Sequence, residues 1–207
     1  LLLLPAALRD KTIDDTIPDW EKDYNLHPNL KILSYEQLSQ VKQADILERL
    51  MPDLVIADEC HKLANKKGAV WRRVSRYFEA YPLQKVFDSD GQVLSEYKTM
   101  FVPMSGSLTN RSLRNYAHIV ELALQAQSPL PRRYIDLEDW ADALDEGVAE
   151  NLRVKPGALS LFCEKGEPVR SGFRRRLIET KGFVSIAESD TDLANVSLVI
   201  NPMRKIE

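Results

Sequence analysis

The sequence predicts an α/β protein, in which a parallel sheet is flanked by helices. Two observations support this class. Apolar runs without polar alternation occur at residues 1–4, 54–57 and 101–104, as expected for strands that are covered on both faces. Segments between them carry apolar residues at helical spacing, and we expect these helices to pack on the sheet.

Composition is that of an ordinary globular protein. The 207 residues, 44% apolar and 29% charged, can hold one substantial core, or one domain with an appendage. No apolar run is long enough for a membrane span, so we expect an intracellular, cytoplasmic protein. The two cysteines lie far apart, in no metal-ligand spacing. A net charge of -3 argues against a protein that coats nucleic acid through its overall charge, but it does not exclude a local basic groove.

In chain order, residues 1–8 read as a strand that breaks at Pro5, and residues 31–38 as a strand followed by a helix. We expect Trp20 to be a packing anchor, residues 39–50 to form a helix, and residues 70–78 to form another. The arginines of that second helix are expected on a solvated face. A turn signal at residues 88–91 predicts a hairpin-like insertion between residues 85 and 97.

The central run, residues 54–57, ends in Asp58, Glu59 and, after a cysteine, His61. Its carboxylates would lie where the carboxyl edge of a parallel sheet opens into a crevice. There Asp58 could hold Mg²⁺, directly or through water, while Glu59 orients the water that attacks a γ-phosphate. The alternative is that both acids cap the following helix.

A later run ends in small hydroxylic residues and glycine, Ser105, Gly106 and Ser107, before an amphipathic helix at residues 111–125. The D-E-x-H box at 58–61 and this S-G-[ST]-x-x-N segment resemble motifs II and III of superfamily-two helicases and translocases, most closely the Swi/Snf-type branch. The resemblance implies a RecA-like sheet, here incomplete, followed by a mainly helical linker region. It also implies ATP and Mg²⁺ as cofactors, with Asp58 holding the metal, Glu59 polarising water and His61 relaying contact to motif III.

Further segments resemble the nucleic-acid contacts of that superfamily. The strand and loop with Pro5, Ala6 and Arg9 are similar to motif Ia, and the S-Y-E-x-L segment with Ser34 and Tyr35 is similar to motif Ib. Both loops would approach a phosphate backbone. The alternatives are an edge strand with solvated charges for Arg9 and a simple helix cap for Ser34.

The last third of the chain differs in character. Prolines at 129 and 131 favour a boundary, with residues 1–127 as a partial first motor domain and residues 128–207 as a helical extension and linker. An acidic helix is expected at 134–152, and a strand of a second motor domain at 197–203. The predicted basic helix with Arg174, Arg175 and Arg176 resembles the arginine-rich segment before that second domain. Its alternative is a solvated face.

The 207 residues contain no G-x-x-x-x-G-K-[ST] phosphate loop. We therefore expect part of an ATP-dependent DNA helicase or translocase, inactive in ATP hydrolysis without that loop. Its expected partners are DNA, or RNA as an alternative, and the missing Walker A segment and second motor domain of the same protein. The competing hypothesis is a non-catalytic nucleic-acid-binding or scaffolding domain with a degenerate helicase fold. A nuclease using Asp58 and Glu59 would need further acids at strand ends.

Overall fold

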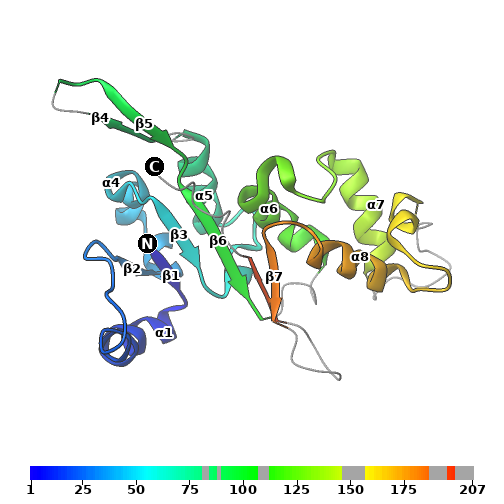
Figure 1. Ribbon diagram of the computed structural model, residues 1–207, viewed down its shortest axis with the longest axis horizontal. Helices are drawn as coiled ribbons and strands as arrows, with labels where there is room; N and C mark the ends of the chain where they lie inside the picture. Colours follow the sequence, from blue (N-terminus) through cyan, green and yellow to red (C-terminus); the bar gives the residue numbers. More distant parts are fainter. Residues whose placement is uncertain (81–83, 88–89, 107–111, 146–156, 187–194, 199–207) are drawn as a thin grey trace. The chain divides into compact units, whose positions relative to one another are not determined.

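The structure is a computed structural model that describes residues 1–80, 84–87, 90–106, 112–145, 157–186 and 195–198 (Figure 1). It divides into two compact units, Leu1–Pro103 and Met104–Glu207.

The first unit contains a four-stranded sheet in which all strands run parallel, which confirms the α/β class. The strands are β1 (Leu2–Leu4), β2 (Ile32–Ser34), β3 (Leu54–Ala57) and β6 (Met100–Ser105), in the order β2-β1-β3-β6. In the register, Leu4 lies opposite Ser34, Leu3 opposite Ala57, and Ala57 opposite Pro103. The carboxyl ends of β1, β2 and β3 are therefore level, and the residues that follow them share one edge of the sheet.

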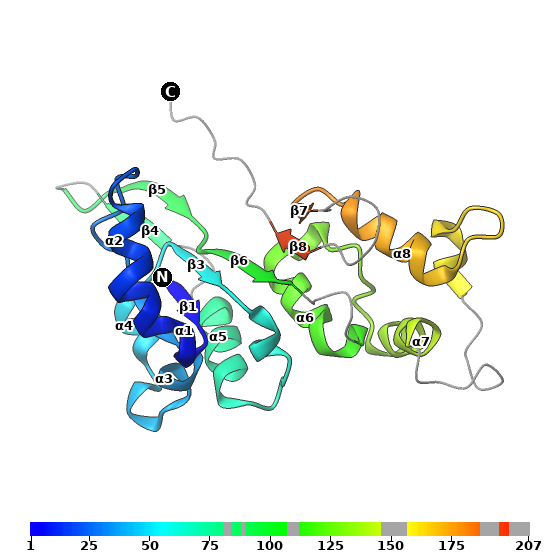
Figure 2. The ribbon, with the colours of Figure 1, turned by 90° about the horizontal axis from the view of Figure 1, so that it is seen from below.

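Short helices connect these strands (Figure 2). Ahead of β2 lie α1 (Ala6–Lys11), a π-helical segment (Thr12–Thr16) and α2 (Ile17–Trp20). Between β2 and β3 lie α3 (Tyr35–Ser39), a 3₁₀ turn (Val41–Gln43) and α4 (Ile46–Leu50). A 3₁₀ turn (Cys60–Leu63) and α5 (Ala69–Ala80) follow β3. The core includes fully buried side chains from strands and helices, among them Leu3, Leu38, Val55, Leu63 and Tyr77.

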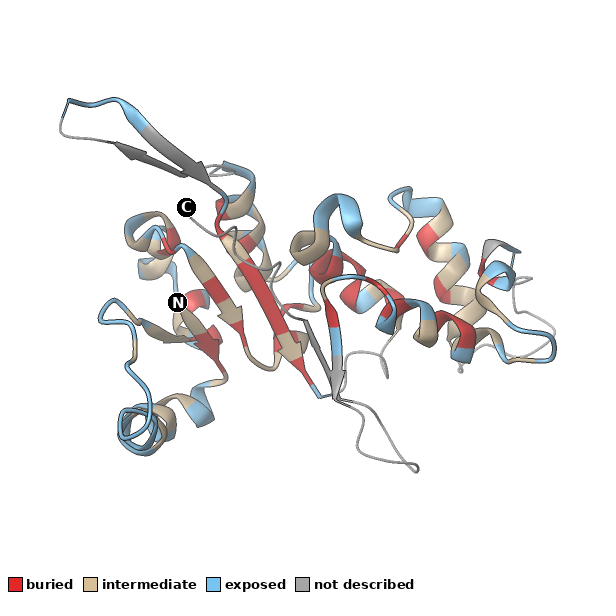
Figure 3. Cartoon of the chain, in the orientation of Figure 1, coloured by how far each residue is buried: buried red, intermediate tan, exposed pale blue. Residues whose placement is uncertain are grey.

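Buried residues concentrate on β1, β3 and β6 and on the inward sides of the helices (Figure 3).

Residues 39–50 differ from the expected single helix. Gln40 has an extended backbone, which ends α3, and Val41 is 89% exposed. The prediction for Trp20 was also wrong, because its side chain is 44% exposed and no residue from Ala6 to Trp20 is buried.

An antiparallel hairpin lies between α5 and β6 and confirms the predicted insertion. Its strands are β4 (Gln84–Phe87) and β5 (Val93–Tyr97), with a register shift between Val86 and Phe87. Gly91 has a φ of 76°, which a residue with a side chain adopts only at a cost.

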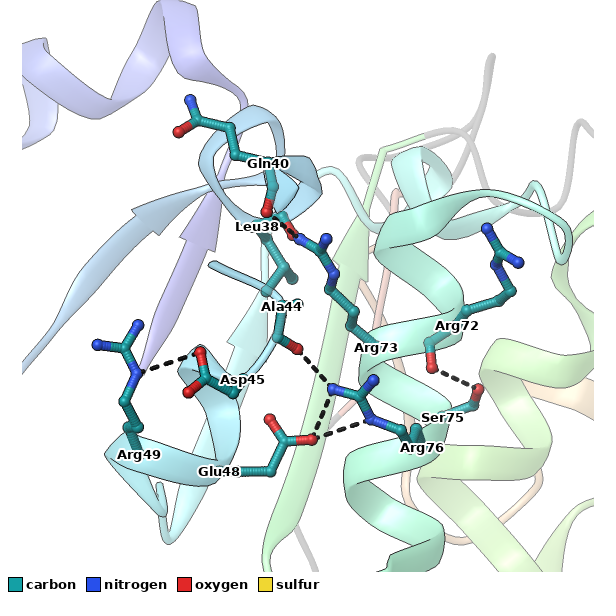
Figure 4. Close-up of polar contacts among 10 residues, drawn as sticks. All are labelled: Leu38, Gln40, Ala44, Asp45, Glu48, Arg49, Arg72, Arg73, Ser75 and Arg76. Atoms are coloured by element: carbon teal, nitrogen blue, oxygen red, sulfur yellow. Dashed lines mark hydrogen bonds and ion pairs between the residues drawn. The ribbon is translucent and has the colours of Figure 1, made fainter. Parts of the chain in front are cut away.

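Two arginines of α5 also make internal contacts, which the sequence did not predict (Figure 4). The Arg76 side chain is nevertheless 52% exposed, in agreement with the predicted solvated face. Arg73 Nη1 donates hydrogen bonds to the carbonyl oxygens of Leu38 and Gln40. Arg76 donates to the carbonyl oxygen of Ala44 and pairs with Glu48 at 2.7 Å. The physical reason is that the ends of short helices leave carbonyl groups without helical partners, and guanidinium groups satisfy them.

The second unit is mainly helical. It contains α6 (Leu113–Leu124), a 3₁₀ turn (Gln125–Gln127), α7 (Tyr134–Leu144), a 3₁₀ segment (Gly157–Phe162) and α8 (Val169–Ile178). Strand β7 (Phe183–Ile186) pairs antiparallel with β8 (Asn195–Leu198), which also pairs antiparallel with Met104 and Ser105 of β6. The expected strand thus begins earlier than residue 197, and its continuation to 203 lies outside the described residues, as do residues 146–152 of the expected acidic helix.

The division between the two compact units falls before α6, between Pro103 and Met104. The reason is an ion-pair network in which the Arg114 guanidinium reaches three acids on or just after α7: Glu138 at 2.7 Å, Asp142 at 2.6 Å and Asp145 at 2.9 Å. This network joins α6 to the helices that follow it. Within the described ranges, no helix has both the length and the apolar character that a membrane crossing requires.

Candidate functional site

The acid pair lies immediately after β3, at the carboxyl edge of the parallel sheet. The backbone N–H of Asp58 donates to the carbonyl oxygen of Leu3 at 3.0 Å, so the pairing with β1 extends one residue beyond β3. Glu59 then turns the chain, with φ 50° and ψ 47° in the left-handed region. Residues other than glycine rarely adopt this conformation, and such departures concentrate at functional sites.

Each carboxylate has a defined position. Asp58 Oδ1 accepts a hydrogen bond from the Glu59 N–H at 2.9 Å, which leaves its second oxygen without a hydrogen bond from any described residue. Glu59 Oε2 lies 3.0 Å from His61 Nδ1, which is close enough for an ion pair when the imidazole is protonated. The angles do not meet hydrogen-bond geometry, and His61 Nδ1 has no hydrogen-bond partner among the described residues. The structure therefore brings all three predicted catalytic residues together on one turn.

A tyrosine fixes the backbone below this turn. The Tyr35 hydroxyl donates to the carbonyl oxygen of Asp58 at 2.6 Å, and the side chain is buried. Burial, and secondly the nearby Cys60 and carboxylates, raise the pKa of Tyr35, so the hydroxyl stays protonated and remains a donor. This bond joins the end of β2 to the end of β3.

The electrostatics of Asp58 favour a cation. Burial raises the pKa of Asp58, the hydrogen bond from Glu59 N–H lowers it, and the charge of Glu59 raises it further, with a net upward shift. A bound cation would offset the cost of holding two adjacent negative charges in a partly buried turn.

The donor set fits Mg²⁺ held together with a nucleotide. Mg²⁺ in phosphate-transfer sites uses one or two carboxylates, with the remaining positions filled by phosphate oxygens and water. Asp58, with one unengaged oxygen, can supply such a carboxylate. Groups of three or more potential metal ligands are absent from the described ranges.

The residues of the predicted motif III belong to the second unit. Ser105 is the last residue of β6, is buried, and lies opposite Val196 of β8. Gly106 follows in an exposed turn, and Ser107 lies outside the described residues.

The predicted motif Ia residues lie at the same sheet edge as the acid pair, but they are held by internal contacts. Pro5 precedes α1, and the N–H of Ala6 donates to Glu36 Oε2 at 2.9 Å. Arg9 pairs with Asp10 at 2.7 Å.

In the predicted motif Ib, the side chains also point to structural roles. Ser34 Oγ accepts from Gln37 N–H at 3.0 Å, while Gln37 Oε1 accepts from Ser34 N–H at 2.9 Å. This reciprocal capping box begins α3, and Ser34 is only 2% exposed. The structure therefore gives Ser34 the helix-capping role that was its alternative interpretation, and it gives Tyr35 the internal bond described above.

The three arginines of α8 differ from one another. Arg175 pairs with Glu164 and with Glu167 at 2.8 Å, and also donates to the carbonyl oxygen of Phe162. The Arg176 guanidinium lies 5.8 Å from the centre of the Phe162 ring. The guanidinium groups of Arg174 and Arg176 have no hydrogen bond or ion pair to a described residue, so within the described ranges Arg175 alone of the three is paired with acids.

Sequence reasoning missed the Tyr35 bond, the left-handed Glu59 and the engaged arginines. A signal existed for the Arg114 network, because Glu138, Asp142 and Asp145 are spaced as neighbours on one helix face. The other contacts join residues far apart in the chain, and no comparable sequence pattern indicates them.

Compared with known proteins, the chain matches no protein-family model, no curated protein and no solved structure.

Proposed function

We propose that this chain is part of an ATP-dependent DNA helicase or translocase, and that its first unit is part of a RecA-like motor domain. One observation carries the proposal: Asp58 and Glu59 follow a central strand of a parallel sheet, at the carboxyl edge where nucleotide-binding α/β proteins hold their ligands.

In this proposal the two carboxylates have separate roles. Asp58, through its unengaged oxygen, would hold Mg²⁺, which neutralises charge on the β- and γ-phosphates when bound. Glu59, whose carboxylate lies beside His61, would orient the attacking water. The hydrogen bond from Tyr35 fixes the backbone from which both carboxylates extend.

The proposal requires a phosphate cradle, and such a cradle joins a strand to a helix. On the side of β6 away from β3, β8 pairs with Met104 and Ser105, and among the described strands none pairs with Met100–Pro103. Phe101 and Val102 are nevertheless buried. A strand that carries the cradle could pair with Met100–Pro103, because parallel strands add along a sheet edge that no described strand occupies.

The decisive experiment is Glu59→Gln in the full-length protein that includes the phosphate cradle. The change keeps the size of the side chain but removes the charge that orients water, so DNA-stimulated ATP hydrolysis should fall by about 10²-fold or more. Binding of Mg·ATP should persist, measured with a fluorescent nucleotide. Glu79→Gln, an exposed change on α5, is the matched control and should behave as the wild type.

If Glu59→Gln lowers nucleotide binding and turnover to the same extent, Glu59 is structural. If the full-length wild type hydrolyses no ATP in the presence of DNA, the non-catalytic scaffolding alternative replaces the motor.

A further inference from the structure

The segment that follows the acid pair is the most positively charged stretch of the chain. From Cys60 to Phe78 there is no acidic residue, whereas the whole chain has a net charge of -3. Six cations fall within these residues, namely Lys62, Lys66, Lys67, Arg72, Arg73 and Arg76.

The structure separates these cations into two groups. Arg73 and Arg76 turn toward the ends of α3 and α4, where they satisfy backbone carbonyl groups. Arg72 points away from that cluster (Figure 4). The side chains of the other group are exposed and have no hydrogen bond or ion pair to a described residue: Lys62, Lys66, Lys67 and Arg72, which we call the basic segment.

Local backbone structure gathers the basic segment into one region. Asn65 accepts hydrogen bonds from Lys67 N–H, at 3.0 Å, and from Gly68 N–H, at 2.9 Å, so the chain turns tightly into α5. A Cβ atom on Gly68 would lie 3.1 Å from the Asn65 carbonyl oxygen, so a side chain there would require a small shift of the turn. Arg72 lies in the first turns of α5, and helical side chains lean back toward the amino end of their helix, here toward Lys66 and Lys67.

Several of the residues first assigned to nucleic acid are less available, although Arg174 and Arg176 have no ion pair to a described residue. Ser34 caps a helix, Tyr35 is buried, Arg9 pairs with Asp10 and Arg175 pairs with two glutamates. Unpaired, exposed cations on flexible stems bind phosphates well, because no internal ion pair has to be broken.

We infer that the basic segment binds the phosphate backbone of nucleic acid. The inference rests on the proposed motor function and gives it a contact surface, which begins three residues after Glu59. Phosphate contacts of this kind position a strand without reading its bases.

The test is a fourfold alanine variant, Lys62→Ala, Lys66→Ala, Lys67→Ala and Arg72→Ala, with binding of labelled duplex DNA measured by fluorescence anisotropy at several salt concentrations. Each phosphate contact contributes about −0.9 to the slope of log K against log salt, so the slope should become shallower by about 3 to 4. Affinity at about 50 mM salt should fall at least about tenfold.

The control variant removes the same charge from exposed residues elsewhere, with Lys31, Lys42, Arg132 and Lys165 each changed to alanine. It should retain most of the wild-type slope. A third variant exchanges lysine and arginine within the basic segment and should bind nearly as the wild type, because it keeps all four charges. Circular dichroism on all three shows whether the fold is intact.

Equal loss in the control and the alanine variant would overturn the inference, as would an unchanged slope in the alanine variant or no binding by the wild type. Parallel measurements with single-stranded DNA and duplex RNA identify the form of nucleic acid bound. A loss that depends on base sequence would also contradict backbone binding. The Glu59→Gln result is independent of these outcomes, because Glu59→Gln should bind DNA as the wild type does.

Discussion

Each of the two units of this chain has a buried apolar core, but the second adds networks in which one arginine binds several acids. In the first unit, fully buried side chains such as Leu3, Leu38 and Val55 surround a parallel ladder of backbone hydrogen bonds. The second unit also has fully buried side chains, such as Leu113, Ile119 and Leu177. In addition, partly exposed arginines on α6 and α8 each bind several acids, and Trp140 contacts Phe162 and Phe173.

This difference predicts which changes should lower the stability of each unit. Burial of apolar surface is indifferent to moderate salt, whereas ion pairs at partly exposed positions weaken as salt screens them. Both units should therefore respond to loss of side-chain volume, and the second should respond in addition to charge and ionic strength.

The largest effect is expected for Leu38→Ala in the first unit. Leu38 is fully buried, and its truncation leaves a cavity that should lower the free energy of unfolding by about 3 kcal/mol. Hydrogen exchange followed by mass spectrometry should show faster exchange in β1, β2 and β3. Val41→Ala, at an 89% exposed position, is the control and should change little. Equal acceleration in α6, α7 and α8 would mean that the units do not unfold separately.

A smaller, salt-dependent effect is expected for Arg114→Met in the second unit. The substitution leaves Glu138, Asp142 and Asp145 without their shared cation, and should lower the free energy of unfolding by about 1–2 kcal/mol at low salt. At about 1 M salt, where the Debye length is about 3 Å, the loss should shrink. Arg132→Met, exposed and outside the network, serves as the control. A loss that is the same at both salt concentrations would assign Arg114 to packing instead.

The smallest effect is a pH dependence at Asp58. Because burial raises the pKa of Asp58, the folded protein keeps its proton in a pH range where the unfolded chain has lost it. In that range the unfolded state binds fewer protons, so stability falls as pH rises.

Asp58→Asn removes this titration. As pH rises above about 4, the ordinary carboxyl range, the stability of the wild type should therefore fall relative to that of the variant, measured by urea unfolding. Asp15→Asn, at an exposed position, should give no such trend. The opposite sign would show that hydrogen bonding to Asp58 outweighs its burial.

The sequence predicted the first unit well because its strands carry a local signal. Apolar runs without alternation located β1, β3 and β6, and a turn signal located the hairpin. The same reasoning placed the acid pair at the end of a central strand, which the parallel register confirms.

Side-chain partners were harder to predict, because they depend on residues far apart in the sequence. The helical spacing of Val41 suggested a buried position, but the chain leaves the helix at Gln40, so the periodicity does not apply there. In the sequence, Arg73 and Arg76 look like part of an ordinary charged helix face. Only the fold places the carbonyl groups of Leu38 and Ala44 beside them. The prediction that Trp20 lies in the core rested on its residue type alone. Residue type does not determine whether other parts of the chain cover a side chain.

The left-handed backbone of Glu59 has an evolutionary consequence. Glycine and asparagine adopt this conformation more readily than glutamate, so either replacement would keep the turn, and could even relax it, while it removes the carboxylate. Under the proposed function, a lineage of such chains would lose hydrolysis in one step without a penalty in folding. Glycine or asparagine at this position in a descendant would then mark a protein that kept the fold and lost the proposed chemistry.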